Sequence, residues 1–144
     1  MEKDFESGMF CKVALTGLFA GICATVGSLL YDLVFCYYSG FPYSAIVNIS
    51  TIIFGITTTV FVAGVLYYYL INASRLGSAI FIVAFIFLTV FCLWRASFAE
   101  RSLVYRETLE FRELLYGIII ITGISCFFLI PTLYKNEAFN KYVV

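Results

Sequence analysis

The chain contains no histidine, and only 12% of its 144 residues are charged. Histidine is the usual haem ligand, the commonest metal ligand and the commonest general base, so its absence argues against the usual forms of those chemistries. Five cysteines occur, but none forms a Cys-x-x-Cys pair, which argues against a redox couple and a zinc site. We therefore predict no metal site, no cofactor and no catalytic residue.

The scarcity of charge also indicates where the protein resides. A soluble domain carries about 25% charged residues, because polar side chains must face water. Here 62% of the residues are hydrophobic, which indicates an integral membrane protein with lipid as its surroundings. Nine basic residues balance nine acidic ones, so the sequence offers no basic surface for nucleic acid.

Charged residues divide the sequence into long uncharged runs. Three of these runs, 13–31, 76–94 and 114–134, hold 19, 19 and 21 residues. A helix needs roughly 20 apolar residues to cross a bilayer core about 30 Å thick. Each run therefore predicts one membrane-spanning helix, because backbone groups in lipid must be bonded within the segment.

A fourth run, 33–74, holds 42 residues and is long enough for the end of one helix and the whole of another. Gly40 and Pro42 lie inside it and favour a turn there. The sequence thus predicts an all-α protein, a single domain built as an antiparallel bundle of four transmembrane helices. We expect these helices at about 13–36, 44–71, 76–94 and 113–134, with a polar loop at 95–112.

Eight of the eighteen charges fall between Arg95 and Glu113. Ser97 and Glu100 have the spacing of a capping box, which would start a helix at that point. Arg106 and Glu110 lie one helical turn apart and are predicted to pair. The block is interpreted either as a surface helix or polar extension of the fourth helix, or as a docking surface or gate.

The first predicted helix carries small residues on one face. Gly17, Gly21, Ala24 and Ser28 recur every three or four residues. Gly-x-x-x-Gly spacing lets two helix backbones approach closely. We predict that this face packs against another helix, either within the bundle or across the seam of a homodimer.

The second predicted helix carries polar residues with similar spacing: Asn48, Thr51, Thr58 and Thr59. Polar side chains are costly in lipid, so this face is expected to look inward, either as helix-contact hydrogen bonds or as a polar path for a solute. Asp32 is the one acid near a span. It is expected at the headgroup level, with a proton or cation site as the alternative.

Charge also predicts an orientation. Five basic residues lie on the side of the termini and four on the other side. By the positive-inside rule this favours cytoplasmic termini. Tyr67 and Tyr134 are expected at one interface, and Tyr31, Trp94 and Tyr116 at the other, because amphipathic rings favour the headgroup level.

The segments "GLFAGICAT" and "FPYSAIVNIS…AGVLYYYLI" resemble the small four-span membrane proteins common in bacteria. That resemblance implies a bacterial inner membrane and no particular activity. We predict a structural or interaction component without catalytic activity, partnered by a second copy or by another membrane protein. The alternative is a small-solute or ion transporter or channel, with Asn48, Thr51, Thr58, Thr59 and Asp32 along its path.

Overall fold

The structure is a computed structural model and describes residues 2–40, 49–100 and 105–136. These residues form helices and no strand. In chain order, the elements are α1 (Glu2–Ser39), α2 (Ile49–Ala73), α3 (Gly77–Ala96), α4 (Tyr105–Ile124), the π-helix η1 (Ser125–Leu129) and α5 (Ile130–Lys135).

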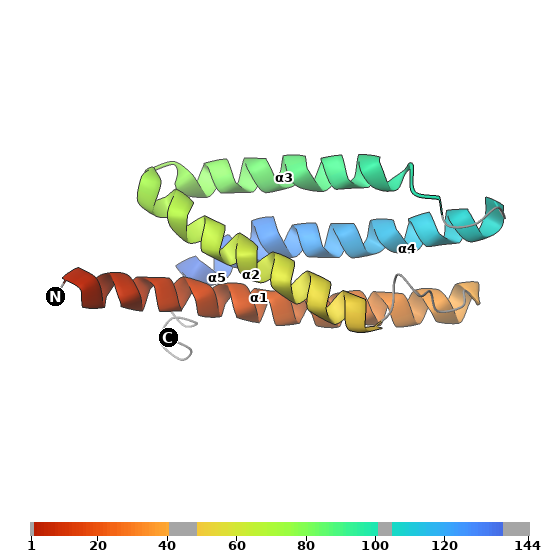
Figure 1. Cartoon of the computed structure of the whole chain (residues 1–144), viewed down its shortest axis with the longest axis horizontal. Helices are drawn as coiled ribbons and strands as arrows, with labels where there is room; N and C mark the ends of the chain where they lie inside the picture. Colours follow the sequence, from red (N-terminus) through yellow and green to blue (C-terminus); the bar gives the residue numbers. More distant parts are fainter. Residues whose placement is uncertain (1, 41–48, 101–104, 137–144) are drawn as a thin grey trace.

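Four segments are long and apolar enough to cross a bilayer: Cys11–Ser39, Ile49–Ala73, Gly77–Ala96 and Tyr105–Lys135. Successive segments run in opposite directions, as Figure 1 shows. The predicted fold class, an all-α antiparallel bundle of four transmembrane helices, is confirmed. The chain is a multi-pass integral membrane protein.

The first and fourth helices both begin earlier in the chain than predicted, because each includes polar residues before its apolar stretch. α1 begins at Glu2 and runs for 38 residues, so Lys12 lies inside the helix and does not mark its start. α4 begins at Tyr105, eight residues before the predicted start at 113. The charged block is therefore in large part a polar extension of the fourth helix. The predicted residues 44–48 of the second helix lie outside the described part of the chain.

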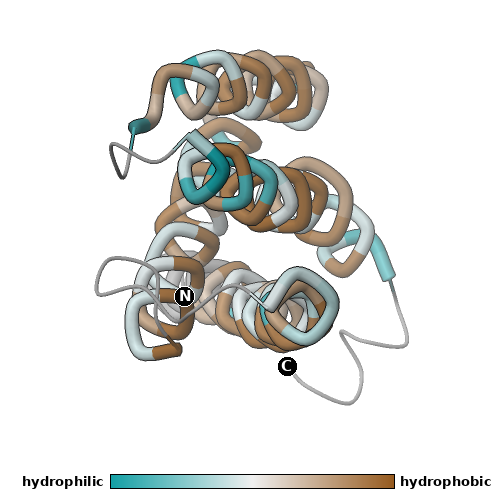
Figure 2. The backbone as a smooth tube through the Cα atoms, turned by 90° about the vertical axis from the view of Figure 1, so that its right-hand side faces the viewer, coloured by the Kyte–Doolittle hydropathy of each residue, from teal (hydrophilic) through white to brown (hydrophobic). Residues whose placement is uncertain are grey.

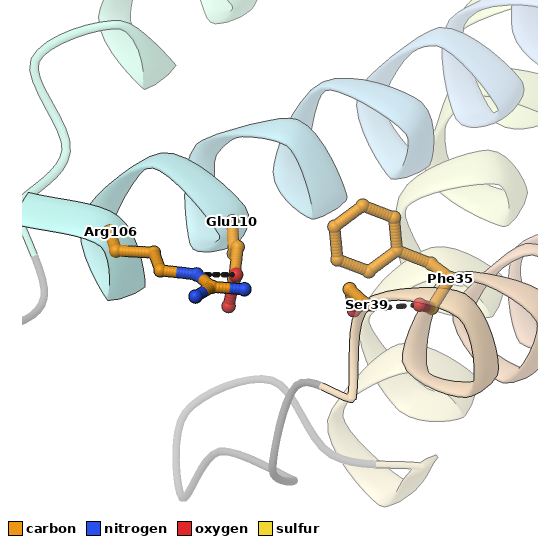
Figure 3. A network of polar contacts seen from close by, with 4 residues as sticks. All are labelled: Phe35, Ser39, Arg106 and Glu110. Atoms are coloured by element: carbon orange, nitrogen blue, oxygen red, sulfur yellow. Dashed lines mark hydrogen bonds and ion pairs between the residues drawn. The ribbon is translucent and has the colours of Figure 1, made fainter.

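The predicted capping box at Ser97 is wrong. Ser97 is the C-cap of α3, and its Oγ donates a hydrogen bond of 2.6 Å to the carbonyl of Trp94. A serine hydroxyl bonded backward to a carbonyl of the preceding helix does not cap the first amides of a following one. The Arg106–Glu110 pair is confirmed, with Nε and Oε1 3.0 Å apart, and Figure 3 shows both side chains on α4.

The last span changes its helical pitch before Pro131. Proline lacks an amide hydrogen, and its ring crowds the carbonyl four residues earlier, so an ordinary α-helix cannot continue unaltered there. The chain forms the π-helix η1 over Ser125–Leu129, and the amide of Ile130 bonds to the carbonyl of Ser125, five residues back. The short helix α5 then begins at Ile130, with Pro131 in its first turn.

The four spans are unequally covered by one another. α1 packs along α2 and also contacts α4, η1 and α5, whereas α3 packs against α2, α4 and η1. Figure 2 shows α3 at one side of the bundle, with α4 between it and α1. In the most apolar stretch of each helix, 44% of the residues of α1 are buried but only 11% of those of α3. α3 therefore exposes most of its apolar surface.

Aromatic side chains close one end of the bundle. The ring of Tyr67 in α2 is buried and lies edge-on to Phe81 of α3, at 4.9 Å, and to Tyr134 of α5, at 5.5 Å. The Nζ of Lys12 lies 4.9 Å from the centre of the Tyr134 ring, within the range of a cation–π interaction. Tyr67 and Tyr134 thus meet at the same end of the molecule, where they were expected together.

Candidate functional site

The backbones of α1 and α2 approach each other closely at two glycines. A Cβ atom built on Gly64 would lie 2.8 Å from the Cα of Gly17, closer than real side chains come. A Cβ atom on Gly21 would lie 3.4 Å from the carbonyl oxygen of Thr57. Ala24 and Ser28 are also buried. Gly17 and Gly21 on the small face of α1 therefore pack against α2 within a single chain.

Glycines also lie at two further helix contacts. A Cβ atom on Gly117 of α4 would collide with the ring of Tyr31 in α1, whose hydroxyl donates a 3.1 Å hydrogen bond to the carbonyl of Glu113. A Cβ atom on Gly123 of α4 would collide with the side chain of Thr89 in α3. Close contacts with small residues hold membrane helices together, because lipid provides no hydrophobic drive between them.

A side-chain hydrogen bond links α1 and α2. The hydroxyl oxygens of Thr25 and Thr57 are 3.0 Å apart, and the Thr25 hydroxyl is also 2.8 Å from the carbonyl of Gly21. A hydroxyl has a single hydrogen. Because Thr25 donates that hydrogen to Gly21, Thr57 is the donor between the two helices. Sequence inspection missed Thr25 and Thr57, since a threonine pair is informative only once the two helices are aligned.

Asp32 is buried among the helices of the bundle. Its side chain is 4% exposed, and its one described polar contact is the thiol of Cys36, at 3.8 Å. Ser28, one turn earlier on α1, is fully buried, and its Oγ has no hydrogen-bond partner among the described residues. Two buried polar side chains thus lie one turn apart on α1, and the protein supplies few hydrogen bonds to them.

The polar residues of α2 do not share one buried face. Its buried residues are Ile52, Ile56, Val60, Ala63, Gly64 and Tyr67. Thr51 and Thr58 are exposed, so the expectation that they look inward is wrong for the single chain. The reason is that mainly apolar residues with the same helical spacing occupy the buried face of α2. Asn48 lies outside the described residues.

Thr59 lies at the edge of a crevice between α2, α3 and α4. The crevice has a volume of about 230 Å³, and its walls include Ile56, Phe85, Thr89, Thr122 and Cys126. Most of this lining is carbon. The candidate residues Asp32, Thr51 and Thr58 do not line it, so the described structure does not bring the predicted polar residues together.

The cysteines are all free, and no group of three or more metal-ligating residues occurs in the described parts of the chain. A scan against protein-family models found no match. Searches of the curated proteins and of the solved structures found no significant match either. The resemblance to small four-span bacterial proteins therefore stays a prediction.

Proposed function

We propose that this chain is a non-catalytic structural or interaction component of a bacterial inner membrane, with both termini in the cytoplasm. It associates through the outer face of α2 with a second copy of itself or with another membrane protein. The outer face of α2 consists of four exposed residues one turn apart: Thr51, Gly55, Thr58 and Val62.

The observation that carries this proposal is the exposed hydroxyl of Thr58. It has no hydrogen-bond partner among the described residues, although the neighbouring Thr59 donates a 2.7 Å bond to the carbonyl of Gly55. An unbonded hydroxyl facing hydrocarbon is unfavourable, and serine and threonine commonly bond across helix contacts in membranes. A neighbouring helix would supply the missing partner.

Gly55 gives a steric argument that a second helix can pack against the outer face of α2. A Cβ atom built there would meet no atom within 4 Å, so the surface around Gly55 is open. Gly55 lies one turn from Thr58, and a helix could approach this stretch of backbone closely. Gly17 and Gly21 of α1 cannot serve this purpose, because α2 already packs against them.

Self-association in mild detergent tests the proposal. We expect light scattering to report more than one chain per micelle for the wild type. Thr58→Leu should shift the protein towards one chain per micelle, because it removes the hydroxyl and adds bulk. Val83→Leu on the exposed side of α3 is the matched control. A monomeric wild type would exclude the second copy, and an unchanged Thr58→Leu assembly would exclude this face.

A small-ion transporter is the second candidate, favoured by the buried Asp32 beside the unpartnered Ser28. An ionisable group inside a membrane helix is a functional hypothesis by default. Proteoliposomes with an entrapped pH-sensitive dye would test it. Proton flux that depends on the protein and is lost in Asp32→Asn, but not in Arg75→Gln, would replace the interaction role by transport.

A further inference from the structure

A second hollow adjoins the crevice between α2, α3 and α4. It lies between the end of α3 and α4 and is lined by Cys92, Arg95, Ala96, Phe98, Ala99, Leu115 and Ile119. Cys92 and Ile119 line both hollows. The two hollows therefore lie next to each other along α3, from Arg95 to Phe85 and Gly123, and we refer to them together as the groove.

The inner part of the groove suits an apolar ligand. Three threonine hydroxyls lie on it, and each donates to a carbonyl of its own helix: Thr59 to Gly55, Thr89 to Phe85 and Thr122 to Ile118, at 2.7, 2.7 and 2.8 Å. The three hydroxyl hydrogens are therefore not available to hydrogen-bond a ligand. A dry cavity of about 150 Å³ accommodates benzene, so the 230 Å³ crevice has room for a longer hydrocarbon segment.

The outer end of the groove carries a positive charge. Arg95 lies in the last turn of α3, is exposed, and has no acidic partner among the described residues. Arg112 of α4 is engaged differently, since its Nε donates a 2.7 Å bond to the carbonyl of Ala99. Arginine binds phosphate well because its planar fork can donate two parallel hydrogen bonds.

The length of the groove matches one leaflet of a bilayer. Phe85 and Arg95 are ten residues apart on a continuous helix. At about 1.5 Å per residue this is a distance of about 15 Å. The hydrocarbon core is about 30 Å thick, so the groove reaches from one boundary to about the middle. Trp94 beside Arg95 is exposed, as expected for an aromatic residue at the headgroup level.

We propose that this groove is a binding site for one anionic phospholipid. The headgroup phosphate binds the guanidinium of Arg95, and one acyl chain lies along α3 past Cys92 into the crevice beside Phe85. An arginine at the rim of an apolar cleft between helices offers hydrogen-bond donors to the phosphate and leaves the cleft to an acyl chain. The site is separate from the outer face of α2 apart from Gly55, and it does not depend on the proposed interaction role.

Native mass spectrometry of the detergent-purified chain tests both halves of the site. The probes are phosphatidylglycerol and phosphatidylcholine with identical acyl chains. We expect the wild type to retain phosphatidylglycerol more strongly. Arg95→Gln should reduce its affinity for phosphatidylglycerol by about tenfold, the value of one charge-assisted hydrogen bond. Arg75→Gln, at the opposite end of α3, should leave the preference unchanged.

The acyl chain is tested separately at the junction of the two hollows. Cys92→Phe should block the groove and reduce retention of both lipids, whereas Cys23→Phe on the exposed side of α1 should not. Circular dichroism of each variant would show that the helices persist. Equal retention of the two lipids by the wild type, or wild-type binding by Arg95→Gln, would overturn the headgroup site. Undiminished lipid binding by helical Cys92→Phe would overturn the acyl-chain site.

Discussion

Gly17 and Gly64 bring the backbones of α1 and α2 into direct contact. A Cβ atom on Gly64 would come within 2.8 Å of the Gly17 Cα, and one on Gly17 within 3.1 Å of the Gly64 Cα. Both neighbours are backbone atoms, which cannot rotate away as a side chain could. The contact therefore tolerates no added atom unless the two helices separate.

Gly64→Ala should destabilise the bundle by about 1–3 kcal/mol, the usual cost of overpacking a well-packed contact. The reason is that α1 and α2 must move apart over the whole contact. Unfolding of the purified protein in mixed micelles with increasing denaturing detergent would measure the loss.

Gly27→Ala is the matched control for Gly64→Ala, because it makes the same change in α1, where a Cβ atom would meet only the side chain of Ile121, at 3.4 Å. It should leave stability unchanged or raise it by about 0.5–1 kcal/mol, the helix preference of alanine over glycine. Equal losses of stability at Gly64 and Gly27 would show that the close backbone contact is not the cause.

The hydrogen bond between Thr25 and Thr57 should contribute modestly to the stability of the bundle. Thr57→Val keeps the shape and deletes the donor to Thr25, so we expect a loss of about 0.6 kcal/mol, the average for such bonds in membranes. Ser28→Ala should cost nothing, because its hydroxyl has no described partner. A double-mutant cycle of Thr25→Val and Thr57→Val isolates the bond, and a coupling energy near zero would show that the pair does not contribute.

The ion pair between Arg106 and Glu110, on the polar extension of α4, should contribute little to the stability of the protein. The side chain of Arg106 is 84% exposed, so solvent screens its attraction to Glu110. Glu110→Gln should reduce stability by less than about 0.5 kcal/mol, as for exposed pairs one turn apart. Melting curves at low and high salt would check this, and a loss above 1 kcal/mol would point to a further role for Glu110.

The four spans place two exposed positions on opposite sides of the membrane. Ser74 lies in the α2–α3 turn and Glu107 in the first turn of α4. In a background without native cysteines, Ser74→Cys and Glu107→Cys should react with a membrane-impermeant thiol reagent from opposite sides. Ser74→Cys should react from the cytoplasm if the positive-inside rule holds. Labelling of both from one side would contradict the four-span topology.

The helices were predictable because the physical constraint is simple: about 20 uncharged residues suffice to cross the bilayer. The face of Gly17 and Gly21 was recognisable for a similar reason, since close helix contacts require small residues with helical spacing. The identity of the covering helix was not predictable. Gly64 becomes informative only when α1 and α2 are aligned in space.

The candidate site was less predictable than the fold. Thr51 and Thr58 share helical spacing with apolar residues that α1 covers, so the pattern did not reveal which face turns inward. Arg95 was read as part of a loop, but it is the last-turn residue of α3 at the mouth of an apolar groove. A groove depends on the packing of three helices, and no pattern within one helix reports it.

Disulfide cross-linking at Thr58 in native membranes tests the interaction role most directly. Thr58→Cys and Val83→Cys would be compared in a background without the five native cysteines, because both positions are exposed but only Thr58 lies on the outer face of α2. Mild oxidation should link the introduced cysteines of two Thr58→Cys chains, in an adduct of twice the mass of the chain, with little product from Val83→Cys. No adduct at Thr58, or equal adducts at both positions, would contradict association with a second copy through the outer face of α2.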